Sequence, residues 1–200
     1  MEDGRRSRGY LPHIDGAGLT QFVSFHLADA LPVGALEQMK AEIAGLPESE
    51  RKAELGRRVE AYCDAGHGEC QLRDPRVARL LQEKLFEHHG TWYTLHAWCV
   101  MPNHGHALLT PLPGLSWSEG MRRVKGGSAF HINHLLGRQG RLWQPESYDV
   151  WMRSESHFWG VVKYIEWNPV KAKIVRDPKL HPWSSANDAA WARFKTLHPG

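Results

Sequence analysis

The sequence has few cysteines, little net charge and no long apolar run. Cys63, Cys70 and Cys99 are too few, and odd in number, for a disulfide framework, which fits a reducing compartment. No apolar run approaches the roughly 18 residues of a membrane span, and the N-terminal segment lacks the apolar core of a signal peptide. The net charge of +3 is too small to identify a nucleic-acid binder by itself. We therefore expect a cytoplasmic protein that does not bind a membrane.

Histidine and tryptophan, in contrast, are abundant. The chain has 13 histidines and nine tryptophans in 200 residues. Flat aromatic rings are surfaces on which unpaired bases stack, although most of these tryptophans should simply pack in the core. The length fits one ordinary domain, which we place at residues 18–186, after a basic arm at 1–17 and before a tail at 187–200.

The order of expected helices and strands predicts the fold. Alternating residues predict a strand over 19–27, and two helices near 36–43 and 48–62 form an apparent surface excursion within about 33–72. Next come a helix capped by Asp74, a hairpin over 91–101 and 104–110, a helix capped by Ser116, a strand near 142–152 and a helix capped by Ser154. This order predicts an α+β, ferredoxin-like (split βαβ) sandwich. In it a four-stranded antiparallel sheet has helices on one face, its other face is free, and the last helix is an addition.

The most informative stretch is MPNHGHALL, residues 101–109. In an extended strand His104 and His106 point to the same face, whereas Gly105 points to the other. Two imidazoles on one face could bind a metal ion and leave coordination positions free for a substrate oxygen. The alternative is that both are ordinary polar residues on the wet face of a half-buried strand.

A second group of candidate site residues lies at the end of the last predicted helix, residues 154–167. Tyr164 and Asn168 are four apart and therefore neighbours on one flank of the helix. Taken alone, Tyr164 could merely bridge core and water. Asn168 precedes Pro169, a pair that is typical of the start of a new helix, and capping would compete with metal binding.

A further group of possible ligands lies in AYCDAGHGEC. Cys63, His67 and Cys70 resemble half of a zinc site, but a structural zinc needs four ligands and the fourth is missing. We interpret this stretch as a glycine-rich connecting loop.

Several blocks together resemble one known family. They are GLTQFVSFHLAD, DAGHGECQLRDP, HAWCVMPNHGHALLTPLPG, HLLGRQGRLWQPESYD, HFWGVVKYIEWNPVKAKIV and HPWSSA. In this order they resemble the REP-associated tyrosine transposases, a branch of the HUH single-strand endonucleases, from about Gly18 to Ala186. The combination of Met-Pro-Asn-His-x-His with a downstream Tyr-Ile-x-x-Asn-Pro-Val is the specific part.

The resemblance implies a function and a set of site residues. His104 and His106 would bind a divalent metal, Mg²⁺ or Mn²⁺, with Asn168 in the place of a third polar ligand. Tyr164 would be the nucleophile that cleaves and rejoins single-stranded or hairpin DNA through a 5′-phosphotyrosine. The protein would be a nucleoid-associated monomer or homodimer. The phenol needs a base to activate it, and His157, earlier on the same helix, is a candidate.

Gly105 departs from the family pattern, in which the residue between the two histidines is bulky and apolar. Glycine removes a side chain that would point towards the covering helices. It should loosen the strand by roughly 0.5 to 1 kcal/mol.

Two basic clusters could contact DNA phosphates. Contacts of this kind position DNA without reading its sequence, and the alternative for each cluster is a solvated face. The residues are Arg122, Arg123 and Lys125 in one cluster and Arg5, Arg6 and Arg8 in the other.

The sequence is also compatible with two other functions. A domesticated relative could bind hairpin DNA or RNA without cutting it, and Gly105 favours that hypothesis. A small-molecule metal hydrolase would use metal-bound water as its nucleophile, so that Tyr164 would be dispensable.

Overall fold

The computed structural model describes residues 5–7, 12–14 and 18–199, and its centre is a four-stranded antiparallel sheet. The strand order is β4-β5-β3-β6. The strands are β3 (Gln21–His26), β4 (Tyr93–Val100), β5 (His104–Pro111) and β6 (Tyr148–Trp151). Two short strands, β1 (Arg5–Ser7) and β2 (Pro12–Ile14), pair separately with each other.

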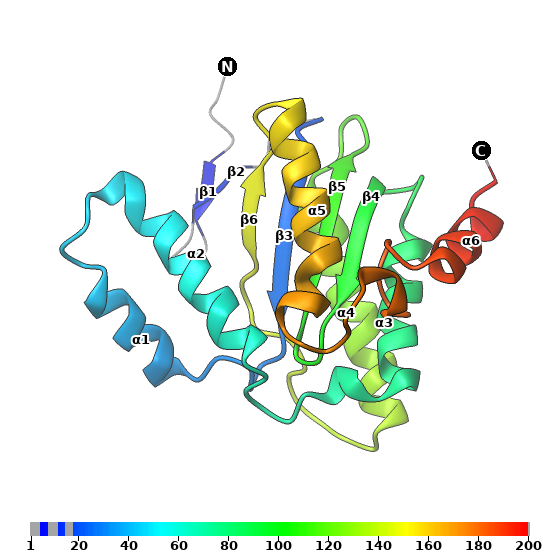
Figure 1. The fold of residues 1–200 in the computed structure, drawn as a ribbon, viewed down its shortest axis with the longest axis horizontal. Helices are drawn as coiled ribbons and strands as arrows, with labels where there is room; N and C mark the ends of the chain where they lie inside the picture. The colour runs from blue at the N-terminus through cyan, green and yellow to red at the C-terminus, as the bar shows by residue number, and fades with distance from the viewer. Residues whose placement is uncertain (1–4, 8–11, 15–17, 200) are drawn as a thin grey trace.

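Helices cover both faces of this sheet. Figure 1 shows α3 (Pro75–Glu87) and α4 (Trp117–Leu135) behind the sheet and α5 (Glu155–Lys171) in front of it. The rear core contains Phe25, whereas Phe22 and Ile165 pack together in the front core. The α+β, ferredoxin-like prediction is therefore confirmed. The expectation of a free second face is wrong, because α5 lays its apolar side on that face.

Two further helices lie beside the edge strand β6 (Figure 1). They are α1 (Val33–Glu42) and α2 (Glu48–Asp64). On α2, Leu55, Val59 and Cys63 are buried in the rear core, so this helix is packed against the domain along one side. Gly56 allows the approach, because a Cβ built there would lie 2.5 Å from Cζ of Tyr148.

The predicted helix starts are confirmed by their caps. The side chains of Asp74, Ser116 and Ser154 each accept a hydrogen bond from a backbone amide of the first turn that follows. The short helices η1 (Gln71–Arg73) and η2 (Pro178–Leu180), and the C-terminal α6 (Asp188–Leu197), complete the described chain.

The end of α5 differs from the prediction. A new helix does not start at Pro169; instead α5 continues through the proline to Lys171. The backbone carbonyl of Asn168 accepts a hydrogen bond from the amide of Ala172 at 2.9 Å, as in a continuing helix. The side chain of Asn168 is consequently not used as a cap. Among the described residues, no helix is long and apolar enough to cross a membrane.

Candidate metal and tyrosine site

The two histidines of β5 form the base of a buried polar cluster. His104 and His106 have no exposed surface and point to the face covered by α5. Their Nε2 atoms are 3.0 Å apart. The strand geometry therefore places the two imidazoles side by side, as the spacing predicted, but in a closed interior and not on a wet face.

Asn103 fixes the orientation of His104. The amide nitrogen of Asn103 donates to the backbone carbonyls of Cys63, at 3.1 Å, and His67, at 2.8 Å. Its oxygen, 2.7 Å from Nδ1 of His104, must then be the acceptor in that contact. Nδ1 carries the proton, and Nε2 presents its lone pair to the cluster. Holding a ligating histidine by its other nitrogen is a common feature of metal sites.

Helix α2 adds two carboxylates that were not predicted from the sequence. Oε2 of Glu60 lies 3.4 Å from Nε2 of His106, and Oδ1 of Asp64 lies 3.6 Å from Nε2 of His104. Ligand atoms of Glu60, His104 and His106 all lie within 4.8 Å of one another. Glu60 is also 3.5 Å from His26 of β3. The two acids are one helical turn apart on α2, but no local pattern in the sequence indicates that this turn meets β5.

Helix α5 contributes the tyrosine and the asparagine predicted from the sequence. The hydroxyl of Tyr164 donates to Oε2 of Glu60 at 3.2 Å, and its ring centroid is 5.7 Å from that of His106. The side-chain amide of Asn168 lies 3.1 Å from Nε2 of His106. All these groups come from one subunit, so no exchange of helices between copies is needed to bring them together.

A lysine stands beside the tyrosine. Nζ of Lys171 donates to Oδ2 of Asp64 at 3.1 Å and lies 5.7 Å from the ring centroid of Tyr164. It links the ends of α5 and α2 at the outer edge of the cluster. The site therefore contains a cation close to the phenol.

Burial and charge determine the protonation states. Burial lowers the pKa of His104 and of His106 although Glu60 opposes this shift, so both rings are neutral at pH 7. Burial alone would raise the pKa of Glu60, but its contact with His26, whose own pKa is raised to about 10, lowers the pKa of Glu60 below the ordinary value. Burial, together with Glu60 and Asp64, raises the pKa of Tyr164 far above that of a free phenol.

These residues fit a divalent cation. Among the described side chains, Oε1 of Glu60, Oδ1 of Asp64 and Oδ1 of Asn168 are buried without a hydrogen-bond partner. A rotation of the Asn168 amide would bring its oxygen to the position now 3.1 Å from His106. Neutral imidazoles with carboxylate and amide oxygens suit Mn²⁺ and related metals, and the oxygens also suit Mg²⁺.

Gly105 is matched by its neighbour across the sheet. A Cβ built at Gly105 would lie 2.6 Å from Cζ of Phe25, its antiparallel partner on β3. The buried phenyl ring therefore fills the space that a side chain would take, as aromatic residues do beside strand glycines. This packing supports the strand that carries His104 and His106.

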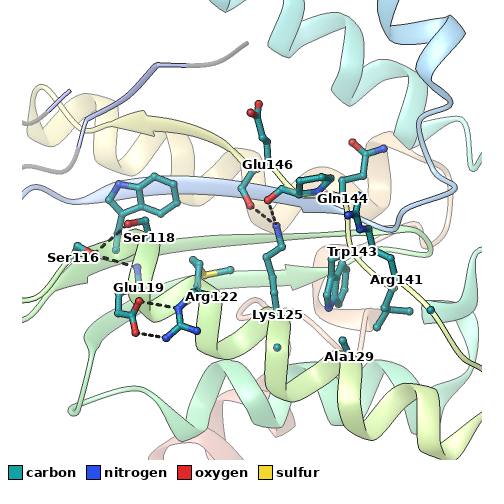
Figure 2. A pocket seen from close by; sticks show the side chains of 17 residues that line it. Ser116, Ser118, Glu119, Arg122, Lys125, Ala129, Arg141, Trp143, Gln144 and Glu146 are labelled. Carbon is teal, nitrogen blue, oxygen red and sulfur yellow. Dashed lines mark hydrogen bonds and ion pairs between the residues drawn. The ribbon is translucent and has the colours of Figure 1, made fainter. Parts of the chain in front are cut away.

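The predicted cluster of Arg122, Arg123 and Lys125 divides into two parts. Arg123 lies over the ring of Trp92, 4.0 Å from its centroid, and pairs with Glu119. Arg122 and Lys125 line a cavity of about 560 Å³ between α4 and residues 140–147, which Figure 2 shows. There Nζ of Lys125 donates to the carbonyl of Pro145 and the hydroxyl of Ser147, each at 3.2 Å, and burial lowers its pKa to about 8.

None of the contacts described above involves the remaining residues predicted from the sequence. Arg5 and Arg6 belong to β1, and Arg8 lies outside the described residues. Nδ1 of His157 accepts from the backbone amide of Arg153, and the hydroxyl of Tyr164 is bonded to Glu60 instead.

The half zinc site is not formed. The thiol of Cys70 donates to the carbonyls of Gly66 and His67, as expected of a connecting loop. Within the described part of the chain, Glu60, His104 and His106 make the only group of three histidine, cysteine or acidic residues that could hold a metal.

A family model matches the part of the chain that carries most of this site. Residues 74–168, just under half of the chain, match the family model described as "Transposase IS200 like". The matched segment includes both histidines, the tyrosine and the asparagine, but not the α2 carboxylates. The match confirms the resemblance to transposases and supports the general class of function, a transposase-like DNA endonuclease.

One solved structure shares the fold of this chain. A structure described as the REP-associated tyrosine transposase bound to a REP hairpin is 19% identical, with a TM-score of 0.57. The alignment covers 92% of this chain and 87% of that one, so the two share a fold. A putative transposase from Deinococcus radiodurans R1 is 18% identical with a TM-score of 0.38, over 82% of this chain and 96% of that one. No curated protein matches the chain.

Proposed function

We propose that this protein cleaves and rejoins single-stranded DNA beside a hairpin, through a covalent 5′-phosphotyrosine at Tyr164. One observation carries the proposal. The Tyr164 hydroxyl shares Glu60 with the paired histidines, so that the phenol and His106 are each within 3.4 Å of the same carboxylate oxygen. The phenol oxygen is thus held beside the residues that could bind a metal ion.

The cation proposed for the site is Mg²⁺ or Mn²⁺. His104, His106 and Asn168 would hold it, and Glu60 joins this set because its oxygens face the same histidines. When bound, such an ion draws charge from a phosphate oxygen and favours the ionised phenol. Asn103 keeps the lone pair of His104 directed at the ion, and Lys171 supplies a second positive charge beside the phenol.

The proposed reaction exchanges one ester for another. The Tyr164 oxygen forms a bond to phosphorus, and the bond from phosphorus to the 3′ oxygen breaks. The phenol proton leaves through Glu60, the acceptor of its hydrogen bond, and the departing 3′ oxygen takes up a proton to become a hydroxyl. Attack by a 3′ hydroxyl on the phosphotyrosine reverses these changes, so rejoining needs no nucleotide cofactor.

The proposed substrate is hairpin DNA with a single-stranded flank. The solved structure that shares this fold is bound to a REP hairpin, and we extend that substrate class to this chain. Arg122 and Lys125 would meet backbone phosphate at the mouth of the cavity, and Arg123 would do so beside Trp92. The arginines of the N-terminal arm, Arg5, Arg6 and Arg8, would add phosphate contacts.

A labelled oligonucleotide tests the proposal. The protein is incubated with Mn²⁺ and a palindromic hairpin carrying single-stranded flanks, and covalent adducts are separated by denaturing electrophoresis. We expect an adduct with the native protein and with Tyr62→Phe, a control tyrosine stacked on His67, but none with Tyr164→Phe. Hairpin binding without any adduct would favour a non-catalytic binding module. If Tyr164→Phe still hydrolysed the labelled oligonucleotide, the nucleophile would instead be metal-bound water.

A further inference from the structure

Two exposed tryptophans distinguish the outer side of α5. Trp159 is 59% exposed and Trp167 is 49% exposed, whereas the other seven tryptophans are buried or half-buried. The two are eight residues apart, so they share one side of the helix at a spacing of about 12 Å. Lys163 lies midway between them and is also exposed. We call Trp159, Lys163 and Trp167 the α5 stripe.

Core packing does not explain this stripe. The side of α5 that meets the sheet is formed by Phe158, Val161, Val162 and Ile165, and these residues make the front core. Trp159 has an edge-to-face contact with Phe158, at 5.2 Å between centroids, which holds its ring against the protein surface. Its remaining surface faces solvent. Two large apolar rings are thus displayed where the fold does not require them.

The charge around the stripe is positive. Among the described residues Lys163 has no ion-pair partner, and Lys173 and Arg176 are exposed just beyond the end of α5. The helix has two carboxylates. Glu155 is in its first turn, and Glu166 accepts a hydrogen bond from Ser185. Anions can therefore approach the length of the stripe from Lys163 to the helix end.

The stripe adjoins the proposed nucleophile. Trp167 is three residues beyond Tyr164, so the two are neighbours on the helix surface. A strand attached to the Tyr164 oxygen would meet Trp167 first. Aromatic rings interleaved with cations are the usual means of holding single strands without reading their sequence, since every base has a face that can stack.

We propose that the α5 stripe binds the single-stranded DNA flank of the substrate, with bases stacked on Trp159 and Trp167 and phosphates near Lys163. This proposal rests on the proposed function, because it assigns the flank of that substrate to a surface. Roughly three stacked nucleotides span the distance between the two rings. A second copy of the chain is a poorer occupant, because a two-fold contact centred on the stripe would bring Lys163 against its own symmetry mate.

Binding without cleavage tests this assignment. Fluorescence anisotropy is measured in the Tyr164→Phe background without divalent metal, on one hairpin with a single-stranded flank of about six nucleotides and on the same hairpin without it. We expect Trp159→Ala with Trp167→Ala to weaken binding of the flanked hairpin by about tenfold or more. Binding of the unflanked hairpin should not change. Tyrosine at both positions should restore most of the affinity, because it still stacks.

Phe130→Ala is the matched control, since Phe130 is 71% exposed but lies on α4. It should leave both affinities unchanged, and thermal unfolding followed by circular dichroism verifies the fold of each variant. The proposal would be overturned if the double alanine variant bound the flanked hairpin as tightly as the protein that retains both tryptophans. Tighter binding of an RNA flank would also overturn it, as would a native dimer that the two alanines convert to monomer. A protein that forms no adduct at all could still pass this test, so the two proposals fail separately.

Discussion

The ring of Phe25 occupies the space that any side chain at position 105 would need. The two residues are partners across β3 and β5, and a Cβ at Gly105 would lie within 3.1 Å of three atoms of the phenyl ring. The glycine between the two histidines and the phenylalanine beside it therefore form one packing unit. Volume missing from one strand is supplied by the other.

This unit predicts a compensating pair of substitutions. Gly105→Leu should lower the free energy of unfolding by about 1 to 3 kcal/mol through overpacking. Phe25→Ala should lower it by about 3 to 5 kcal/mol through the cavity that it leaves. The double variant should be more stable than the sum of the two losses implies, by about 0.5 to 3 kcal/mol. Urea unfolding of all four proteins measures this coupling, and strictly additive losses would contradict it.

Asn103 should matter to metal binding although it is not itself a proposed ligand. Asn103→Ala removes the acceptor that fixes the proton on Nδ1 of His104, so the affinity for Mn²⁺ should fall by about 10- to 100-fold. Calorimetric titration with Mn²⁺ measures the change. Asn133→Ala is the control, because Asn133 lies on α4 and donates to the carbonyl of Gly140. If both variants bind Mn²⁺ like the native protein, Asn103 has no positioning role.

Gly56 should control how closely α2 approaches the site. Gly56→Ala places a methyl group against the ring of Tyr148, and it should cost about 1 to 3 kcal/mol in unfolding free energy. Because Glu60 is one turn further along α2, Mn²⁺ affinity should fall as well. Gly34→Ala on α1 is the control, since a Cβ there meets nothing within 4 Å. It should leave metal affinity unchanged, and a parallel fall in both variants would show that the effect is not specific to α2.

Lys125 gives hairpin binding a pH dependence. Burial lowers its pKa to about 8, so the ammonium is present below that pH and is lost as the pH rises through it. Hairpin affinity should fall between about pH 7 and 9 in the native protein, and Lys125→Met should remove this component. Anisotropy at constant ionic strength measures it. An identical fall in the Met variant would show that another group is responsible.

Lys125 should also make the stability of the fold depend on pH, and here a rise in pH is favourable whereas it weakens hairpin binding. Its pKa is about 8 when folded and 10.5 in the ordinary state, so between these values the unfolded chain binds more protons. The contribution of Lys125 should therefore increase the free energy of unfolding as the pH rises from 8 to 10.5. Urea unfolding at several pH values should show a smaller gain in Lys125→Met than in the native protein.

Local signals in the sequence were sufficient for much of this architecture. Asp74, Ser116 and Ser154 mark helix starts through short-range capping, and the alternation of His104 and His106 defines a shared face within one strand. Such features depend on residues within a few positions of each other. They can therefore be predicted without knowing where distant segments pack.

The parts that were missed depend on long-range packing. Glu60 precedes His106 by 46 positions and Tyr164 by 104, and nothing in α2 itself indicates that its last turns cover β5. Asn168 was misleading for a related reason. Asn-Pro is a good local cap, but contact with His106 and the front core keeps α5 helical through Pro169.

The hydrogen bond from Tyr164 to Glu60 has a consequence for the protein at rest. The phenol is a very weak acid and the carboxylate a very weak base, so the proton stays on oxygen and the tyrosine is latent. Positive charge added to the cluster would lower the pKa of the phenol and so favour its ionised form, while it would leave Glu60 a weak base. The interior that assembles the reactive groups thus also keeps them dormant, and whatever enters it serves as the trigger.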